Sequence, residues 1–239
     1  MPSIKKEIFG TSSLWTLRNT KGNELKVTDL GARVVSMRFR DKDFKNLFLL
    51  KDDAAAGIVL VDGGADFAKI IWQGEQTPEG VKFSAKLDEK EVSVIYSLSN
   101  DNEISIRYKA TGIADISTQM TFSAAALPDI DFRSCEKGAA WEKIADEKIY
   151  PVTEPAEVMM EIGMFGYDIG CPIDYLDGGL KNAANLFCPA ASVEIIAYAT
   201  QNKIHAKSVD GGFALWTSGT DAVDGKIKSQ TVYMIKNRK

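Results

Sequence analysis

Histidine is the scarcest reactive residue in this chain of 239 residues, because His205 is the only one. A Ser-His-Asp or Cys-His nucleophile system, a histidine-rich zinc site or a two-histidine acid-base pair cannot be built unless His205 lies at its centre. The chain also lacks the GxGxxG, Walker and HExxH patterns, which bind dinucleotides, nucleotide phosphates and zinc. We therefore expect neither a cofactor nor a metal site.

Cysteines, long apolar runs and excess positive charge are scarce as well. The three cysteines, Cys135, Cys171 and Cys188, form no CxxC pair, which favours reduced thiols in a cytoplasmic protein over one disulfide plus a free thiol. Without an apolar run of about eighteen residues we expect no membrane span, and Met1 to Ser13 shows no apolar segment of a secretory signal. The net charge of −4 argues against nucleic acid as a partner. The oligomeric state stays open.

What the chain does have is the period-two alternation of half-buried strands. Met37 and Phe39 alternate with Ser36, Arg38 and Arg40. Leu25 and Val27 alternate with Lys26 and Thr28 in the run before it, and Gly31 between the two runs indicates a bulge or a close backbone approach. The clearest hairpin joins Glu91–Leu98 to Glu103–Lys109 through the polar loop 99–102.

The same pattern recurs along most of the chain. Further predicted strands cover 14–19, 24–28, 46–50, 58–61, 81–85, 116–127, 193–199, 203–208, 213–217 and 230–235. We expect loops over Gly74–Gly80 and Gly163–Gly179. Residues 139–145 could line one face of a short helix. With a dozen or more short strands, almost no helix and no linker, the sequence predicts a single all-β domain over residues 1–239, a large β-sandwich.

Several segments, taken in order, resemble the galactose mutarotase (aldose 1-epimerase) superfamily. The resemblance begins in Lys26–Leu50 and continues through Gly80–Ala85 and the hairpin 94–111. It extends to Gly179–Gln201 and to Phe213–Thr217; it covers most of the chain and is weakest over residues 129–170. This resemblance implies a galactose mutarotase-like supersandwich with a sugar-binding face, and a small sugar or an oligosaccharide as the ligand.

Members of this superfamily interconvert the α and β anomers of an aldose without a cofactor. The resemblance implies a glutamate that removes the anomeric proton and a histidine that protonates the ring oxygen. Such chemistry demands a proton acceptor and a proton donor on opposite sides of the sugar, both with pKa values near neutrality.

This chain departs from the family at those positions. The histidine of the family's "NHSYFNL" segment aligns with Phe122, Ser123 or Ala124, and the glutamate of "ALETQ" aligns with Trp216. None of these side chains protonates a ring oxygen at neutral pH. A general acid or base contributes on the order of 10² to 10⁴ in rate, so we expect no efficient mutarotase by the family mechanism and assign no catalytic residue.

Other positions are candidates for contacts with a sugar. Trp216 could stack on a pyranose face, and Trp72 and Trp141 are weaker candidates of the same kind. Phe122 lies in the histidine position, and Asp66 and Lys69 align with family positions that contact sugar or phosphate. Asp168, Asp174 and Asp177 could bind hydroxyls or a hard cation, although a solvated loop is the commoner role of such residues. His205 lies on an alternating strand, in a region that the family does not use for proton transfer.

Three hypotheses follow from the sequence. The first is a carbohydrate-binding protein without efficient mutarotase activity. The second is an active epimerase with replacement groups, for example Asp66 or Asp174 as base and a tyrosine or lysine as acid. The third is an interaction scaffold that binds no sugar.

Overall fold

The alternating segments form antiparallel strands that make three sheets in the computed structural model of the protein, which describes residues 2–52, 56–152, 179–220 and 222–238. The N-terminal sheet contains, in spatial order, β1 (Ser3–Phe9), β2 (Ser12–Arg18), β3 (Glu24–Thr28), β4 (Val34–Arg40) and β5 (Asn46–Phe48). It is a meander, because each strand pairs with the next one along the chain.

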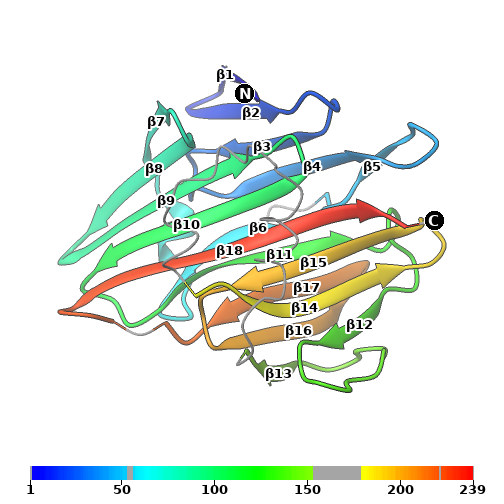
Figure 1. Cartoon of the computed structure of the whole chain (residues 1–239). Coiled ribbons are helices and arrows are strands. Elements are labelled where there is room, and N and C mark those ends of the chain that lie inside the picture. Colours follow the sequence, from blue (N-terminus) through cyan, green and yellow to red (C-terminus); the bar gives the residue numbers. More distant parts are fainter. Residues whose placement is uncertain (1, 53–55, 153–178, 221, 239) are drawn as a thin grey trace.

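The other two sheets combine strands from distant parts of the chain. The β18 sheet contains β12 (Asp131–Ser134), β14 (Lys181–Cys188), β15 (Val193–Ala199), β18 (Lys226–Asn237), β10 (Glu103–Thr111), β9 (Lys90–Leu98), β8 (Gly80–Leu87) and β7 (Gln73–Thr77). The β17 sheet contains β13 (Lys148–Pro151), β16 (Lys203–Val209), β17 (Gly212–Ser218), β11 (Ile116–Ser123) and β6 (Gly57–Val61). Figure 1 shows β18 running through the middle of its sheet, with the N-terminal sheet at one end of the molecule and β12 and β13 at the other.

The β17 sheet packs face to face on the β18 sheet. The rings of Phe122 and Tyr233, one from each sheet, meet edge to face with centroids 6.1 Å apart. The hydroxyls of Thr217 and Thr231 are 3.1 Å apart across the same interface. Alternate residues of the facing strands therefore fill one core, as in a β-sandwich, and the opposite face of the β17 sheet points outward.

Glycine sets how closely the N-terminal sheet approaches the turn after β6. Gly31 has φ of +70°, and a Cβ atom there would lie 2.5 Å from the carbonyl oxygen of Ala68. The Gly31 amide donates to the Ile70 carbonyl at 2.8 Å. The close backbone approach predicted for Gly31 is confirmed, and the register of β3 and β4 shifts between Lys26 and Val27.

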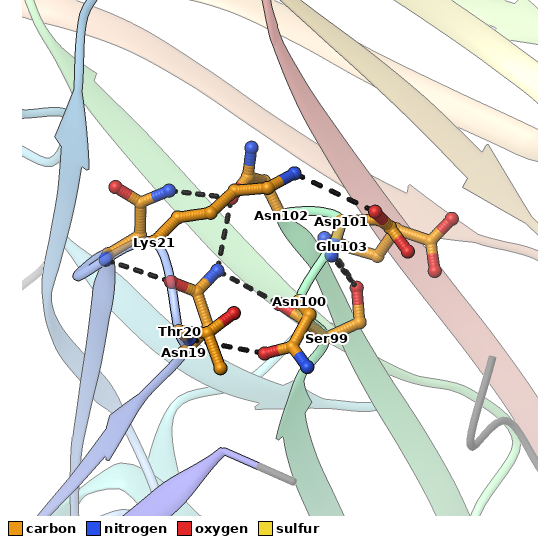
Figure 2. A network of polar contacts seen from close by, with 9 residues as sticks. Asn19, Thr20, Lys21, Ser99, Asn100, Asp101, Asn102 and Glu103 are labelled. Atoms are coloured by element: carbon orange, nitrogen blue, oxygen red, sulfur yellow. Dashed lines mark hydrogen bonds and ion pairs between the residues drawn. The ribbon is translucent and has the colours of Figure 1, made fainter. Parts of the chain in front are cut away.

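An asparagine junction, made of Asn19, Asn23 and Asn102, joins the N-terminal sheet to the hairpin of β9 and β10 (Figure 2). Asn102 Oδ1 accepts from the side-chain amides of Asn19 at 3.0 Å and Asn23 at 2.6 Å. Asn23 Oδ1 accepts in turn from the Arg40 amide at 2.9 Å. Asn19 and Asn23 are each 4% exposed and Asn102 is half-buried, so most of this polar network is withdrawn from solvent. Its bonds cross between sheets.

The structure confirms the predicted β-sandwich and the hairpin of β9 and β10, and it corrects two local expectations. Residues 139–145 form no helix: Glu142 instead makes an isolated bridge with Phe132 of β12. The predicted loop Gly74–Gly80 is largely strand β7, an exposed edge strand. Polar edge strands lack the apolar alternation on which sequence reading depends, while their backbone still pairs with a neighbour.

Two further observations bear on domain organisation and membranes. One core cluster contains residues from all three sheets. This agrees with a single domain, but a single domain over all of residues 1–239 stays a prediction. The helix that the structure describes, η1 (Asp66–Lys69), has four residues, and no helix in the described part of the chain could span a membrane.

Candidate functional site

The two segments that align with the family's acid and base lie side by side. Strands β11 and β17 pair antiparallel, with Met120 opposite Leu215 and Phe122 opposite Phe213. The alternation within β17 buries Phe213, Leu215 and Thr217 and leaves Trp216 half-buried on the outer face. The outer face of the β17 sheet around Trp216 is therefore the candidate site.

Trp216 belongs to a row of side chains that crosses this outer face, which we call the Trp216 row: Ile149, His205 and Trp216. Ile149 pairs with His205, and His205 pairs with Trp216, across β13, β16 and β17. The imidazole of His205 stacks on the Trp216 indole with centroids 4.8 Å apart and planes 13° apart. Ile149 is 56% exposed, so the row presents an apolar, partly aromatic surface to solvent.

Two hydrogen bonds fix the orientation of His205. Its Nδ1 lies 3.2 Å from Glu147 Oε1, and its Nε2 lies 2.7 Å from Ser218 Oγ. An ionised carboxylate only accepts, so Nδ1 carries the proton that it donates to Glu147. In the neutral imidazole, Nε2 then accepts from the Ser218 hydroxyl. The Trp216 ring consequently rests on an imidazole that is held at both nitrogens.

The chemistry open to this group follows from its connectivity. Ser218, His205 and Glu147 are linked in the order of a serine hydrolase relay. Ser218, however, is the last residue of a β-strand in register with Lys203, and not a nucleophile on a sharp turn. Anomer exchange requires an acid and a base on opposite sides of the sugar, whereas His205 and Glu147 bond to each other. The group can move a proton, but it lacks the separation that the family mechanism needs.

Polar side chains on the neighbouring strand β11 complete the outer face. Gln119 is half-buried there and lies opposite Ile58 of β6. Ser123, one of the three residues in the family's histidine position, is half-buried at the end of β11. Gln119 precedes Met120, which pairs with Leu215, so its amide lies beside the Trp216 ring, whereas Ser123 pairs with Gly212 farther along β17. An amide beside an aromatic ring is a usual means of binding sugar hydroxyls.

Two of the candidates named from the sequence are core side chains. Phe122 has no exposed surface and packs on Tyr233. Trp72 is 2% exposed, and its indole N–H donates to the Phe67 carbonyl at 2.8 Å. Burial leaves neither ring a surface for a sugar, so we leave both out of the site.

Asp66 and Lys69 come together, but as an exposed pair of their own. They lie three residues apart on η1, with Lys69 Nζ 3.6 Å from Asp66 Oδ1 and side chains 76% and 80% exposed. Asp174, like Asp168 and Asp177, lies outside the described residues. Of the sequence candidates within the described residues, Trp216 is the one that lies on the outer face.

Trp141 lies apart from this face, against strands β12 and β14. Trp141 is 37% exposed and packs under the Arg133 guanidinium, 4.8 Å from the ring centroid, and near Phe187. Within the described ranges, no three histidine, cysteine or acidic side chains gather in a way that could hold a metal ion.

His205, Glu147 and Ser218 were not identified as site residues from the sequence. A signal for His205 was available, because Asp210-Gly211 is a two-residue hairpin turn. With Val209 opposite Gly212, counting outward along both strands places His205 opposite Trp216. Glu147 gave no such signal, since it precedes a short strand that the sequence did not reveal.

Comparison with known proteins supports the fold that these strands build. No family model and no curated protein matches the chain. Among solved structures, the chain is similar to a galactose 1-epimerase from Lactobacillus acidophilus, at 13% identity and a TM-score of 0.59, covering 100% of this chain and 99% of that one. It is also similar to a GalM/aldose epimerase homologue from C. elegans, at 13% identity and a TM-score of 0.56, with 100% of both chains covered. A putative mutarotase from Salmonella typhimurium matches at 8% identity and a TM-score of 0.57, covering 98% and 94%. The chain therefore has the fold of the galactose mutarotase and aldose 1-epimerase superfamily.

Proposed function

We propose that this protein binds a small sugar or a short oligosaccharide on the outer face of the β17 sheet, without efficient anomer exchange. The observation that carries the proposal is the half-buried Trp216 indole, supported from one side by His205 at 4.8 Å. A ring held rigid in this way loses little freedom when a pyranose packs its C–H groups on it. Gln119, polar and half-buried on β11 beside Trp216, supplies hydrogen bonds to the hydroxyls.

A titration of the purified protein tests this proposal. We expect glucose, galactose or one of their disaccharides to bind in the millimolar to micromolar range, measured by calorimetry or ligand-observed NMR. Trp216→Ala should weaken the affinity about tenfold or more, since a lost aromatic contact of about 1.5 kcal/mol corresponds to a factor of ten.

Trp141→Ala is the matched control for this titration. It removes another partly exposed indole, which lies on Arg133 and outside the Trp216 row, and it should leave the affinity unchanged. Equal losses in the two variants would contradict the site. If the parent protein bound none of these sugars, the result would favour the interaction scaffold instead.

A second candidate function, residual anomer exchange, is favoured by one observation: His205 bonds to both Glu147 and Ser218. Polarimetry of freshly dissolved glucose or galactose distinguishes the candidates. We expect the parent protein to match buffer, because one linked acid-base pair replaces two opposed groups. A faster rate that is lost in His205→Gln and kept in Trp141→Ala would assign the exchange to this group and overturn the expectation.

The absence of efficient catalysis, the cytoplasmic location and the lack of a nucleic-acid partner belong to the same proposal. Net charge supports the last of these, and the thiol of Cys188 supports the location. Burial raises the pKa of the Cys188 thiol, and the thiol donates to the Pro128 carbonyl at 3.0 Å. Such a thiol is a packing group and not a nucleophile.

A further inference from the structure

A second concave surface lies on the β18 sheet, apart from the Trp216 row. It is a groove of about 470 Å³ whose described lining residues come from β7, β8, β9, β10 and β18. Those residues include five lysines, one glutamate and no aromatic side chain: Lys82, Lys86, Lys109, Lys226, Lys228 and Glu91. The groove is thus basic, whereas the chain as a whole carries a net charge of −4.

Cross-strand register concentrates this charge. Lys109 of β10 lies directly opposite Lys228 of β18, and both side chains are exposed. Like charges in directly opposed positions of a sheet destabilise the pair of strands. Two residues further along, Lys226 lies opposite Thr111 on the same face. The sheet therefore tolerates an unfavourable arrangement that an anion would relieve.

Neighbouring carboxylates neutralise only part of the groove. Lys86 forms an ion pair with Glu91 at 2.8 Å, and Lys82 forms one with Glu75 at 2.8 Å. Within the described part of the chain, no carboxylate forms an ion pair with Lys109, Lys226 or Lys228. Three ammonium groups on two adjacent strands remain available for a ligand.

The spacing of these groups selects the kind of ligand. Lys109 and Lys228 face each other across one strand interval of about 4.8 Å, and Lys226 lies two residues on, about 7 Å along β18. Ser93, opposite Lys109, adds a hydroxyl on the same face. One tetrahedral oxyanion suits the lysine pair, and a second one about 7 Å away reaches Lys226. A neutral sugar finds no aromatic surface among the described lining residues.

We propose that this groove binds a small ligand that carries two or more phosphate or sulfate groups. Lys109 and Lys228 hold one oxyanion, and Lys226 with Thr111 holds another. Lysine ammonium groups donate to each oxyanion as point charges, and the serine and threonine hydroxyls orient it. The site is independent of sugar binding at the Trp216 row, because it lies on the other sheet.

Binding of tripolyphosphate and of sucrose octasulfate, each measured by calorimetry at 50 mM and 200 mM salt, tests the proposal and separates phosphate from sulfate ligands. We expect saturable binding of at least one probe, weakened at the higher salt concentration. The double variant Lys109→Gln/Lys228→Gln should weaken binding tenfold or more. Its melting temperature should not fall below that of the parent, because the variant removes a like-charge pair.

The matched control is Lys42→Gln/Lys45→Gln, which makes the same change in net charge at two exposed lysines in the turn between β4 and β5. It should leave probe binding unchanged. Equal weakening in both double variants would overturn the proposal, since the effect would then be one of overall charge. Failure of both probes to bind at 50 mM salt would overturn it as well. So would tighter binding of a dT8 oligonucleotide than of either probe, because the groove would then serve nucleic acid.

Discussion

The asparagine junction and the Trp216 row use polar side chains in opposite ways. In the junction, Asn102 Oδ1 serves two buried side-chain amides, and the Asn102 carbonyl accepts from the Ile235 amide at 3.2 Å. In the row, His205 is bonded through both nitrogens, but its partners Glu147 and Ser218 are side chains at the surface. Asn19 and Asn23 of the junction are 4% exposed and Asn102 is half-buried, whereas the row presents a ring to solvent.

This contrast separates the polar groups that stabilise the fold from those that can bind a ligand. Side chains that satisfy backbone groups of a distant element are costly to replace, because each lost partner leaves a buried group unsatisfied. Side chains that bond to one another on an outer face can be exchanged at lower cost. Stability should therefore depend on the junction, and binding should depend on the row.

The largest expected effect is that of Asn102→Ala. The substitution removes the acceptor of the Asn19 and Asn23 amides and places a Cβ-only residue at φ of +68°. We expect a loss of about 3–4 kcal/mol in the free energy of unfolding, measured by urea denaturation. Sugar affinity per folded molecule should not change.

Asn100→Ala is the control for this loss, since Asn100 sits in the same hairpin loop but accepts a single exposed hydrogen bond from the Thr20 amide at 3.1 Å. Its cost should stay below about 1 kcal/mol. If both variants lost the same stability, the asparagine junction would contribute no more than an ordinary loop contact, and the contrast with the row would fail.

The sequence predicted much of the fold because its signals are local. The hairpin of β9 and β10, from Lys90 to Thr111, was predictable from the alternation of its two strands and the polar loop between them. Strand β12 and strand β13 were missed, since each is four residues long and too short to show a period. The junction was missed for another reason: Asn19 and Asn102 are separated by 83 positions, and no local pattern pairs them.

Of the candidate site, only Trp216 was predicted, because it aligns with the family's glutamate and its flat ring could stack on a sugar. Its partner His205 required the register of the β16–β17 hairpin, which the Asp210-Gly211 turn encodes. Identifying Glu147 as a site residue required the position of the edge strand β13, which the sequence did not reveal. Phe122 was a candidate by alignment with the family alone, and the alternation of β11 turns it into the core.

A smaller effect is expected for the contact within the row. A double-mutant cycle of His205→Ala and Trp216→Ala should give a coupling of about 1 kcal/mol in the free energy of unfolding, because stacked rings of this kind contribute about 0.5–1.5 kcal/mol beyond area burial. Sugar affinity should fall in His205→Ala as well, since the indole loses its support. Additive effects on stability, with affinity unchanged, would mean that the imidazole does not position the ring.

The smallest effect is a pH dependence at the junction's edge, where Glu103 follows Asn102 (Figure 2). Burial raises the pKa of the Glu103 carboxyl above its ordinary value of 4.5, Asp101 raises it further, and Lys236 opposes both. A carboxyl with a raised pKa favours the folded state while it is protonated, and this contribution is lost as the pH rises through the folded-state pKa. Glu103→Gln should therefore gain stability relative to the parent protein between pH 4 and pH 8, measured by urea denaturation in steps of pH.

Glu91→Gln should show the opposite trend, because a hydrogen bond from Lys86 lowers the pKa of the exposed Glu91. A flat difference for Glu103→Gln would show that Lys236 compensates the burial of the Glu103 carboxylate in full.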